Sequence, residues 1–444
     1  MGCILYTQRK SSEAASTSKV AEEKPLKPAR RGKGKGKTEQ ATADVDVLFS
    51  KSANIKDLQE MLKKPAKTPE EKYRVLEARD KLMRMERGKQ LKQGVGGRLH
   101  GTCPDMCPEK ERYLRESQHQ VHPYELKLTK EYSMNHTAAI KQYSRSSADQ
   151  EEPLPHELRP SKVLVMAMNY MVLNIMDRSE RKEENLRDWY FYVWDRTRAI
   201  RKDITQQQLC DMDSALLVEQ CARFHIHCAE QLVGEDLSVF DEKINNENLT
   251  KCLQTLKHLY HDLAMKGEYC PNEAEFRGYI ILMNLGDGNF MWEVQELRQE
   301  IQQSTPVRFA VQVYFALSSG NYVRFFNLVK SASYLNACLM HRYFNQVRTK
   351  ALAAIARSYS FQSKVAQFPV SNLVNILNFE SLEQGEMFCE HYGLELDPTR
   401  KFICLGRNAL PPTNSVFPPT RAVNVIESKR KCTIGEVSFD ICKN

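Results

Sequence analysis

Two cysteines near residue 100 have types and spacing that could bind a metal. Cys103 and Cys107 are separated by three residues, with His100 and His119 on either side. Thiolates and imidazoles are the usual ligands of Zn²⁺, but a zinc site normally combines two such half-motifs, and no second one lies nearby. We therefore expect a rigid turn in which Pro108 starts the next helix, and we predict neither a metal nor a cofactor.

The remaining reactive side chains do not form a catalytic pattern. His225 and His227 lie in a helical pattern, where residues two apart point to different faces, so we expect core or partly exposed histidines. The thirteen cysteines are scattered along the chain, which indicates reduced thiols in the cytosol or nucleus. Lys37-Thr38 resembles the end of a phosphate-binding loop, but Arg31 stands where that motif requires glycine. We predict that the protein is not an enzyme and has no small-molecule substrate.

Charge is distributed unevenly along the chain. From Ile301 to Phe379 there is no Asp or Glu, whereas Glu380 to Asp397 contains six acids and no Lys or Arg. Two neighbouring regions of opposite charge suggest a surface for charged partners. The first 100 residues contain 24 Lys and Arg but only 13 Asp and Glu. The basic character therefore belongs to this N-terminal part and to the acid-free block.

The N-terminal part of the chain divides into a tail and a helix. Residues 1–66 have the composition of a disordered basic tail. Its cationic run from Arg30 to Lys37 suits an importin groove or a nucleic-acid backbone, and equally a solvated run of charge. Residues 67–98 are expected to form a charged docking helix from Pro69 to about Lys92, followed by a glycine hinge. No apolar run reaches the ~18 residues that a membrane span needs.

From residue 108 onward the periodicity of apolar residues predicts helices joined by short connections. We therefore expect a mainly α protein, in which residues 99–305 form a helical domain. Residues 306–365 add a helix pair and a long basic helix from Tyr334 to about Ser358. Such a pair cannot bury its apolar face alone and must stack on its neighbours, as in right-handed tetratricopeptide-like arrays.

Residues 366–408 show a different pattern of predicted elements. Two short helices precede two strands around a tight turn, which is the content of a winged helix. The second helix carries Glu383, Glu386 and Glu390, and phosphates would repel these carboxylates. We therefore expect this winged helix to bind a protein partner through its acidic helix.

Positive charge lies on both sides of that acidic helix in the sequence. Any nucleic acid is expected to run along the long basic helix and the turn between the two strands. The candidate nucleic-acid-binding residues are Arg342, Arg348, Lys350, Arg357, Lys364, Arg400 and Lys401. Residues 409–444 are expected to form an irregular tail with one strand at Val423–Ile426.

A second cluster of cations ends the helix predicted from Glu183 to Asp203. Arg196, Arg198 and Arg201 lie in its last turns. Cations at a helix C-terminus stabilise the helix dipole, which is a sufficient explanation for them. Their density makes contact with a partner or a phosphate a second interpretation, and they are the candidate partner-binding residues outside the winged helix.

Several long strings of this sequence resemble the signature of the Sac-three/GANP family, over roughly Asp57 to Leu405. Strings of this length are highly specific. They are Gly101-Thr102-Cys103-Pro104-Asp105-Met106-Cys107-Pro108-Glu109-Lys110-Glu111-Arg112, Lys141 to Pro155, Asp195 to Asp203, Phe240 to Asn248, and Ser331-Ala332-Ser333-Tyr334-Leu335.

The resemblance implies a helical-repeat domain that ends in a PCI-like winged helix. It also implies a non-enzymatic scaffold of a transcription-coupled mRNA-export complex at the nuclear pore, with a PCI-domain protein and a small acidic Sem-type subunit as partners. In that family, two juxtaposed winged helices are taken to bind nucleic acid, so mRNA or another single strand is expected and a membrane is not. The chain shows none of the Phe-Gly repeats of large family members.

A second function remains open from the sequence. Short relatives of this family are associated with centrosome duplication and the mitotic spindle. In that alternative the protein binds only other proteins, and the basic block meets an acidic partner at the centrosome or spindle instead of RNA in the nucleus.

Overall fold

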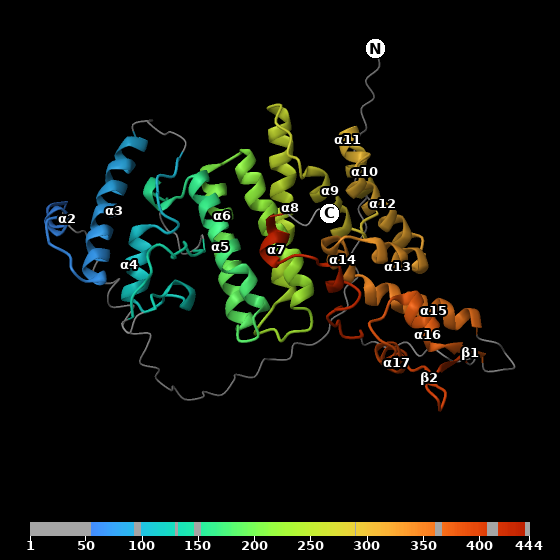
Figure 1. Cartoon of the computed structure of the whole chain (residues 1–444). Helices are drawn as coiled ribbons and strands as arrows, with labels where there is room; N and C mark the ends of the chain where they lie inside the picture. Colours follow the sequence, from blue (N-terminus) through green and yellow to red (C-terminus); the bar gives the residue numbers. More distant parts are fainter. Residues whose placement is uncertain are drawn as a thin grey trace, which may run out of the picture. The chain divides into compact units, whose positions relative to one another are not determined.

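The structure, a computed structural model, describes residues 55–92, 99–128, 132–145, 152–288, 290–359, 366–405 and 416–439 (Figure 1). Most of the predicted basic tail, including its cationic run, therefore lies outside the described residues. The prediction of a mainly helical protein is confirmed, because helices make up most of the described ranges and the strands there form one three-stranded sheet.

The first described elements surround the family-like string near residue 105. They are α2 (Ile55–Leu62), α3 (Pro69–Lys92), α4 (Glu109–Ser117), η1 (Pro123–Glu125) and η2 (Pro155–Glu157). α2 corrects the sequence interpretation, which placed residues 55–62 in the disordered tail. α3 packs against α4. It begins at a capping box, in which Glu71 N donates to Thr68 Oγ1 at 3.2 Å and Thr68 N donates to the Glu71 carboxylate at 3.1 Å.

The central helices follow one another with short connections, as predicted. They are α5 (Ser161–Asn174), η3 (Met176–Glu180), α6 (Leu186–Gln207), α7 (Met212–Gln231), α8 (Glu242–Met265) and α9 (Glu273–Met283). α7 packs against α5, α6 and α8, and most of its residues are buried. Asn185, Asp211 and Asp241 accept hydrogen bonds from backbone N–H groups at the starts of α6, α7 and α8.

Two short helices and then the helices of the acid-free block follow. They are α10 (Phe290–Gln295), α11 (Gln299–Gln302), α12 (Thr305–Ser318), α13 (Tyr322–Ser331), α14 (Tyr334–His341) and α15 (Phe344–Tyr359). α12 and α13 form the expected pair, with Gly320 at φ 68° in the turn and α12 packed on α9. The single long helix predicted from Tyr334 is wrong. The helix breaks at residues 342–343, where Tyr343 Oη donates to the Met283 carbonyl at 3.0 Å, a tertiary contact that periodicity does not report.

A small mixed unit follows α15. Its elements are β1 (Ala366–Pro369), α16 (Val370–Leu377), α17 (Leu382–His391), β2 (Glu395–Leu396) and β3 (Phe402–Leu405). The three strands are antiparallel with β3 in the middle, so that Phe368 pairs with Ile403 and Leu396 also pairs with Ile403 from the other side. The two helices and the β2–β3 pair were expected from the sequence, whereas β1 was not. We call these five elements the β-unit.

The segment from residue 416 to 439 is ordered and returns to the central helices. It contains η4 (Glu427–Lys429) and α18 (Ile434–Phe439), and α18 packs against α5 and α7. The strand predicted at Val423–Ile426 is wrong, because these residues form a turn. Gly435 lies so close to α5 that an added Cβ would be 2.9 Å from the Val172 carbonyl oxygen. We call residues 416–439 the return segment.

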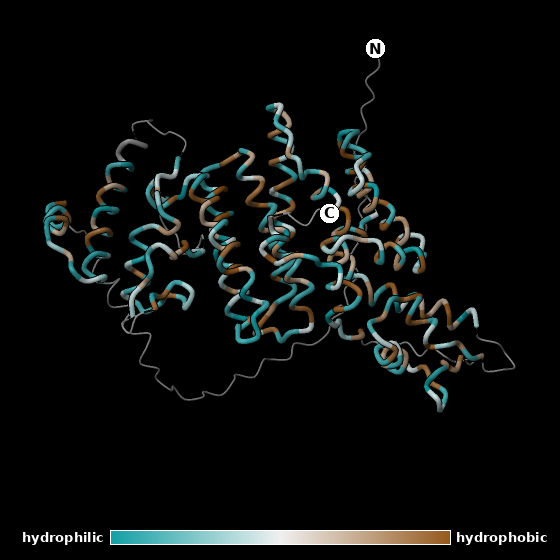
Figure 2. The backbone as a smooth tube through the Cα atoms, viewed as in Figure 1, coloured by the Kyte–Doolittle hydropathy of each residue, from teal (hydrophilic) through white to brown (hydrophobic). Residues whose placement is uncertain are grey.

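Hydropathy follows the packing. Figure 2 shows apolar and polar stretches alternating along the helices, which is typical of amphipathic helices that each bury one face. Most buried apolar side chains form one large cluster, which includes residues of α7, α15, the β-unit and the return segment, and a smaller second cluster contains Cys107, Val121, Met134 and Ala139. Among the described helices, none combines the length and the apolar character that crossing a membrane requires.

Candidate nucleic-acid and partner interface

Two of the predicted nucleic-acid-binding residues share an exposed face of α15, and a third is exposed just before it, with its Nη1 2.7 Å from Met283 Sδ. Lys350 and Arg357 are exposed on α15, and Arg342 is exposed in the turn before it. Gln346, also exposed, precedes Lys350 by four residues, and Arg357 follows Lys350 by seven, so the side chains lie along one side of the helix. We call these four residues the basic face. Lys364, the fifth candidate of this block, lies outside the described residues.

Arg348 has a different position, which corrects its place among the surface candidates. Its residue is only 4% exposed. The guanidinium donates to the carbonyls of Leu377 at 3.1 Å and Asn378 at 2.6 Å, at the C-terminus of α16, and it lies 4.1 Å from the centre of the Phe379 ring. Burial lowers the pKa of Arg348 to about 9, so the group remains charged at neutral pH. Arg348 therefore holds the β-unit on α15 and is not available to a phosphate.

The turn between β2 and β3 brings a predicted nucleic-acid residue against predicted partner residues. Arg400, at φ 55°, donates from Nε to Glu386 Oε2 at 2.5 Å, and its Nη2 lies 2.9 Å from Glu390 Oε1. Arg400 therefore already pairs with two carboxylates of the β-unit, which leaves less of its charge for a phosphate. Lys401 is exposed, and its carbonyl accepts a hydrogen bond from Val370 N at 2.9 Å. Glu383, the remaining acid of α17, is exposed and precedes Glu386 by three residues and Glu390 by seven, so it lies on the same side of the helix.

The outer face of α17 is also apolar, which the sequence analysis missed. Leu382 is 52% exposed and Met387 is 59% exposed, beside the carboxylate of Glu383. Two large apolar side chains at such exposure on one short helix are typical of a surface that another protein covers. At helical spacing Leu382 and Met387 lie about 140° apart around α17, on either side of the row of Glu383, Glu386 and Glu390.

The three arginines of α6 have separate positions. Arg196 is buried, and its Nη2 lies 3.2 Å from the buried carboxylate of Glu125, so it is a core residue and not a partner contact. Arg201 donates to Asn248 Oδ1 at 2.7 Å and thereby joins α6 to α8. Arg198, which like Arg201 is partly exposed, is stacked on the rings of Tyr143 and Trp194 at 3.9 and 4.6 Å. The cluster is therefore not one surface.

Of the residues first considered for metal binding, the two cysteines are buried, whereas His100 and His119 are exposed. Cys103 and Cys107 are buried, and Cys107 Sγ lies 3.1 Å from Arg115 Nη2. Burial raises the pKa of both thiols, which disfavours the thiolate that zinc requires. His225 and His227 are buried, so that, of the core and the partly exposed positions expected from the sequence, the core position is confirmed. Burial lowers the pKa of each to about 3. Within the described ranges no cluster of three metal-ligating side chains occurs.

The expectation of reduced thiols holds for most of the described cysteines but not for all. Ten of them are free thiols, and Cys432 is disulfide-bonded.

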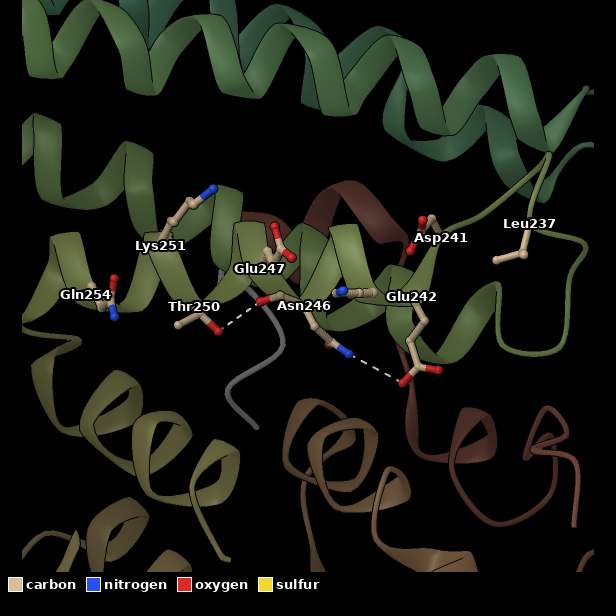
Figure 3. Close-up of a pocket in the computed structure, with 9 residues that line it drawn as sticks. Leu237, Asp241, Glu242, Asn246, Glu247, Thr250, Lys251 and Gln254 are labelled. Carbon is tan, nitrogen blue, oxygen red and sulfur yellow. Dashed lines mark hydrogen bonds between the residues drawn. The ribbon is translucent and has the colours of Figure 1, made fainter. Parts of the chain in front are cut away.

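A surface hollow of about 730 Å³ lies along α8 (Figure 3). Its lining residues are Leu237, Asp241, Glu242, Lys243, Asn246, Glu247, Thr250, Lys251 and Gln254. Apart from Leu237 and Asp241, all of them come from this single helix. Thr250 Oγ1 donates to the Asn246 carbonyl and Asn246 Nδ2 donates to Glu242, so these groups bond within the helix. The hollow is shallow and is lined by charges of both signs. Its polar side chains do not point toward a common centre.

The fold is that of a mainly helical protein with charged surface regions, and comparison with known proteins gives its family. The chain belongs to the SAC3/GANP family, whose model matches residues 106–398, which confirms the resemblance of the sequence. Protein xmas of Drosophila melanogaster is 49% identical over 391 residues, covering 87% of this chain and 18% of that protein.

Two further relatives bear the family name. SAC3 family protein 1 of Schizosaccharomyces pombe is 34% identical over 352 residues, covering 74% of this chain and 34% of that protein. SAC3 family protein B of Arabidopsis thaliana is 35% identical over 309 residues, covering 67% of this chain and 18% of that protein. The chain thus spans about a third or less of the length of these relatives.

Proposed function

We propose that this chain is a non-enzymatic scaffold of a transcription-coupled mRNA-export complex in the nucleus. One observation carries the proposal: the exposed basic face of α15 adjoins a β-unit whose outward helix is acidic and apolar. The first surface suits a phosphate backbone, and the second suits a protein. The family resemblance supplies the process, mRNA export, and the kind of partner.

In this proposal the β-unit is a PCI-like winged helix. Two helices followed by an antiparallel β2–β3 pair, with β1 on the other edge of β3, support that assignment. A PCI-domain protein covers Leu382, Glu383 and Met387 on α17, and a small acidic Sem-type subunit completes the complex. Single-stranded RNA lies beside this contact on Arg342, Lys350 and Arg357, with Lys401 at the turn. Arg348 and Arg196 are left out because they are buried.

Charge reversal on the basic face tests the RNA role. The variant Arg342→Glu/Lys350→Glu/Arg357→Glu is expected to bind single-stranded RNA more weakly, and the slope of log affinity against log salt is expected to fall by about 2, because each lost phosphate contact removes about 0.7. Affinity is measured by fluorescence anisotropy with a labelled oligouridylate between about 50 and 200 mM salt.

The matched control is Lys63→Glu/Lys64→Glu/Lys67→Glu, which makes the same change of charge at exposed lysines between α2 and α3. A salt slope that is unchanged in the α15 variant, or that falls equally in the control, would remove the basic face from the proposal.

The partner contact is tested separately on α17. Leu382→Asp/Met387→Asp is expected to abolish co-purification of a PCI-domain partner, because each substitution places a charge in a contact that must exclude water. RNA binding by the isolated chain is expected to stay unchanged. Lys162→Asp/Met166→Asp, at exposed positions of α5, is the control. Retention of the partner by the α17 variant would contradict this part of the proposal.

A further inference from the structure

The exposed side of α6 carries a row of alternating cationic and aromatic side chains. Arg187, Phe191, Trp194 and Arg198 follow at intervals of four, three and four residues, which places them on one side of the helix. Arg187 and Phe191 are exposed, and Trp194 and Arg198 are partly exposed. Tyr143, from the segment that crosses α6, adds a further ring. We call these five residues the α6 ladder.

Successive members of the ladder are in contact. The Arg187 guanidinium lies 6.0 Å from the Phe191 ring, and the rings of Phe191 and Trp194 are 5.9 Å apart and nearly perpendicular. Arg198 then lies over both Trp194 and Tyr143, at 4.6 and 3.9 Å from the ring centres. A guanidinium stacked by its face leaves its N–H edges for other acceptors.

The charges of the ladder are not neutralised by described residues. The other arginines of α6 are used in the fold, since Arg196 pairs with Glu125 and Arg201 bonds Asn248. Neither Arg187 nor Arg198 has a carboxylate within ion-pair distance in the described part of the chain. Asp195, beside Arg198 in sequence, already accepts from Arg196 at 2.5 Å and from Tyr143 N at 3.1 Å. The exposed Asp188 is the one acid next to the row in the first turn of α6.

We propose that the α6 ladder binds single-stranded RNA, as a second site separate from the basic face of α15. Its cations contact phosphates, and unpaired bases stack on the exposed Phe191 ring and on the parts of the Trp194 and Tyr143 rings that Arg198 leaves uncovered. Duplex RNA keeps its bases inside and cannot use such rings, so the ladder selects single strands.

A purely structural role does not account for the ladder. The segment that carries Tyr143 is already held on α6, because Lys141 Nζ lies 2.6 Å from Asp203 Oδ1 and Tyr143 N bonds Asp195. Phe191 is not a core side chain either, because 40% of its surface remains exposed. An acidic polypeptide would use the two arginines but would gain little from three aromatic rings, which favours nucleic acid.

Photo-crosslinking of the full chain to an oligouridylate containing 4-thiouridine tests the site. Adducts located by mass spectrometry are expected on Tyr143, Phe191 or Trp194, and they are expected to persist in Arg342→Glu/Lys350→Glu/Arg357→Glu. Failure of the α15 site and failure of the ladder are therefore distinguishable. Adducts confined to α15 and the β-unit would overturn the inference.

Affinity measurements provide the second test. Trp194→Ala is expected to weaken oligouridylate binding about tenfold, which is the usual effect of losing one stacked base, without changing the salt slope. Because Trp194 is partly buried, Phe191→Ala serves as a second variant, and circular dichroism checks that both are folded. Arg187→Glu/Arg198→Glu is expected to lower the salt slope by about 1.4.

The control for charge is Lys63→Glu/Lys64→Glu, and poly-L-glutamate is the competing probe. If Arg187→Glu/Arg198→Glu reduces binding of poly-L-glutamate but leaves oligouridylate binding unchanged, the ladder is a site for an acidic protein and the RNA inference is wrong. Equal loss of single-stranded and duplex RNA binding in Trp194→Ala and Phe191→Ala would also contradict it.

Discussion

Replacing Glu125 by glutamine is expected to lower the free energy of unfolding by about 3–5 kcal/mol. The Glu125 carboxylate is fully buried and accepts from Arg115 Nη1 at 2.6 Å, Arg196 Nη2 at 3.2 Å, Ile140 N at 3.0 Å and Tyr192 Oη at 3.0 Å. Glutamine keeps the shape but removes the buried carboxylate that the two guanidinium groups share, which leaves Arg115 only with Glu111 at 3.4 Å and Arg196 only with Asp195 at 2.5 Å. Urea unfolding followed by circular dichroism measures the loss.

A matched control is Glu293→Gln. Glu293 pairs with Lys257 at 2.7 Å, but both side chains are nearly half exposed, so the pair contributes at most about 1 kcal/mol. If both substitutions lowered the free energy of unfolding by the same amount, the buried network around Glu125 would contribute no more than an exposed ion pair.

The pH dependence of the Glu125→Gln effect follows from the pKa of Glu125. Burial would raise this pKa, but Arg196 and Arg115 outweigh burial and hold it below its ordinary value of 4.5. A carboxyl with a lowered folded pKa binds more protons when unfolded, so its contribution is complete above pH ~4.5 and is lost as the pH falls through the folded pKa. The difference between wild type and Glu125→Gln is therefore expected to shrink below pH ~4. A difference that grows on acidification would contradict this sign.

Replacing Arg348 by alanine is expected to cost about 3 kcal/mol, concentrated in the β-unit. The substitution leaves the buried carbonyls of Leu377 and Asn378 without a donor and removes the contact with Phe379, and a hydrogen bond from a charged group contributes about 1.5–3 kcal/mol. Hydrogen exchange is expected to speed up in α16 and β1, while α7 keeps its protection.

Lys350→Ala is the control for Arg348→Ala, because Lys350 is exposed on the same helix. It is expected to leave exchange in α16 unchanged and to weaken RNA binding. Arg348→Ala is expected to speed up exchange in α16 and to leave RNA binding unchanged at temperatures where the β-unit stays folded. Faster exchange throughout the chain, or none in α16, would show that Arg348 does not hold the β-unit locally.

Local patterns in the sequence predicted the helices well, because a cap and a run of apolar residues at helical spacing suffice. α3 begins at the predicted Pro69 and α12 begins one residue before the predicted Pro306. The break at residues 342–343 could not be predicted in this way. The break coincides with a contact between Tyr343 and Met283, 60 residues apart in sequence, and no glycine or proline marks the position.

The same distinction applies to the candidate interface. Composition identified the acid-free block, but helical spacing alone did not separate the buried Arg348 from the exposed Lys350 two residues later. Burial of a charge depends on acceptors supplied by another element, here the C-terminus of α16. For Arg196 the acceptor is Glu125, 71 residues earlier in the chain, and no local pattern indicates that pairing.

The return segment affects how strongly a ligand that reaches both α17 and the basic face would bind. It bonds the β-unit, where Asn424 N and Val425 N donate to Glu380, and the central helices, where Ala422 N donates to Glu230 and Gly435 N donates to Asp177. Asn345 Nδ2, on α15, also donates to the Phe417 carbonyl of this segment at 2.8 Å, so the return segment contacts both α15 and the β-unit that carries α17. A ribonucleoprotein that reaches both surfaces binds the second at a high effective concentration, so its avidity exceeds either affinity without any new contact.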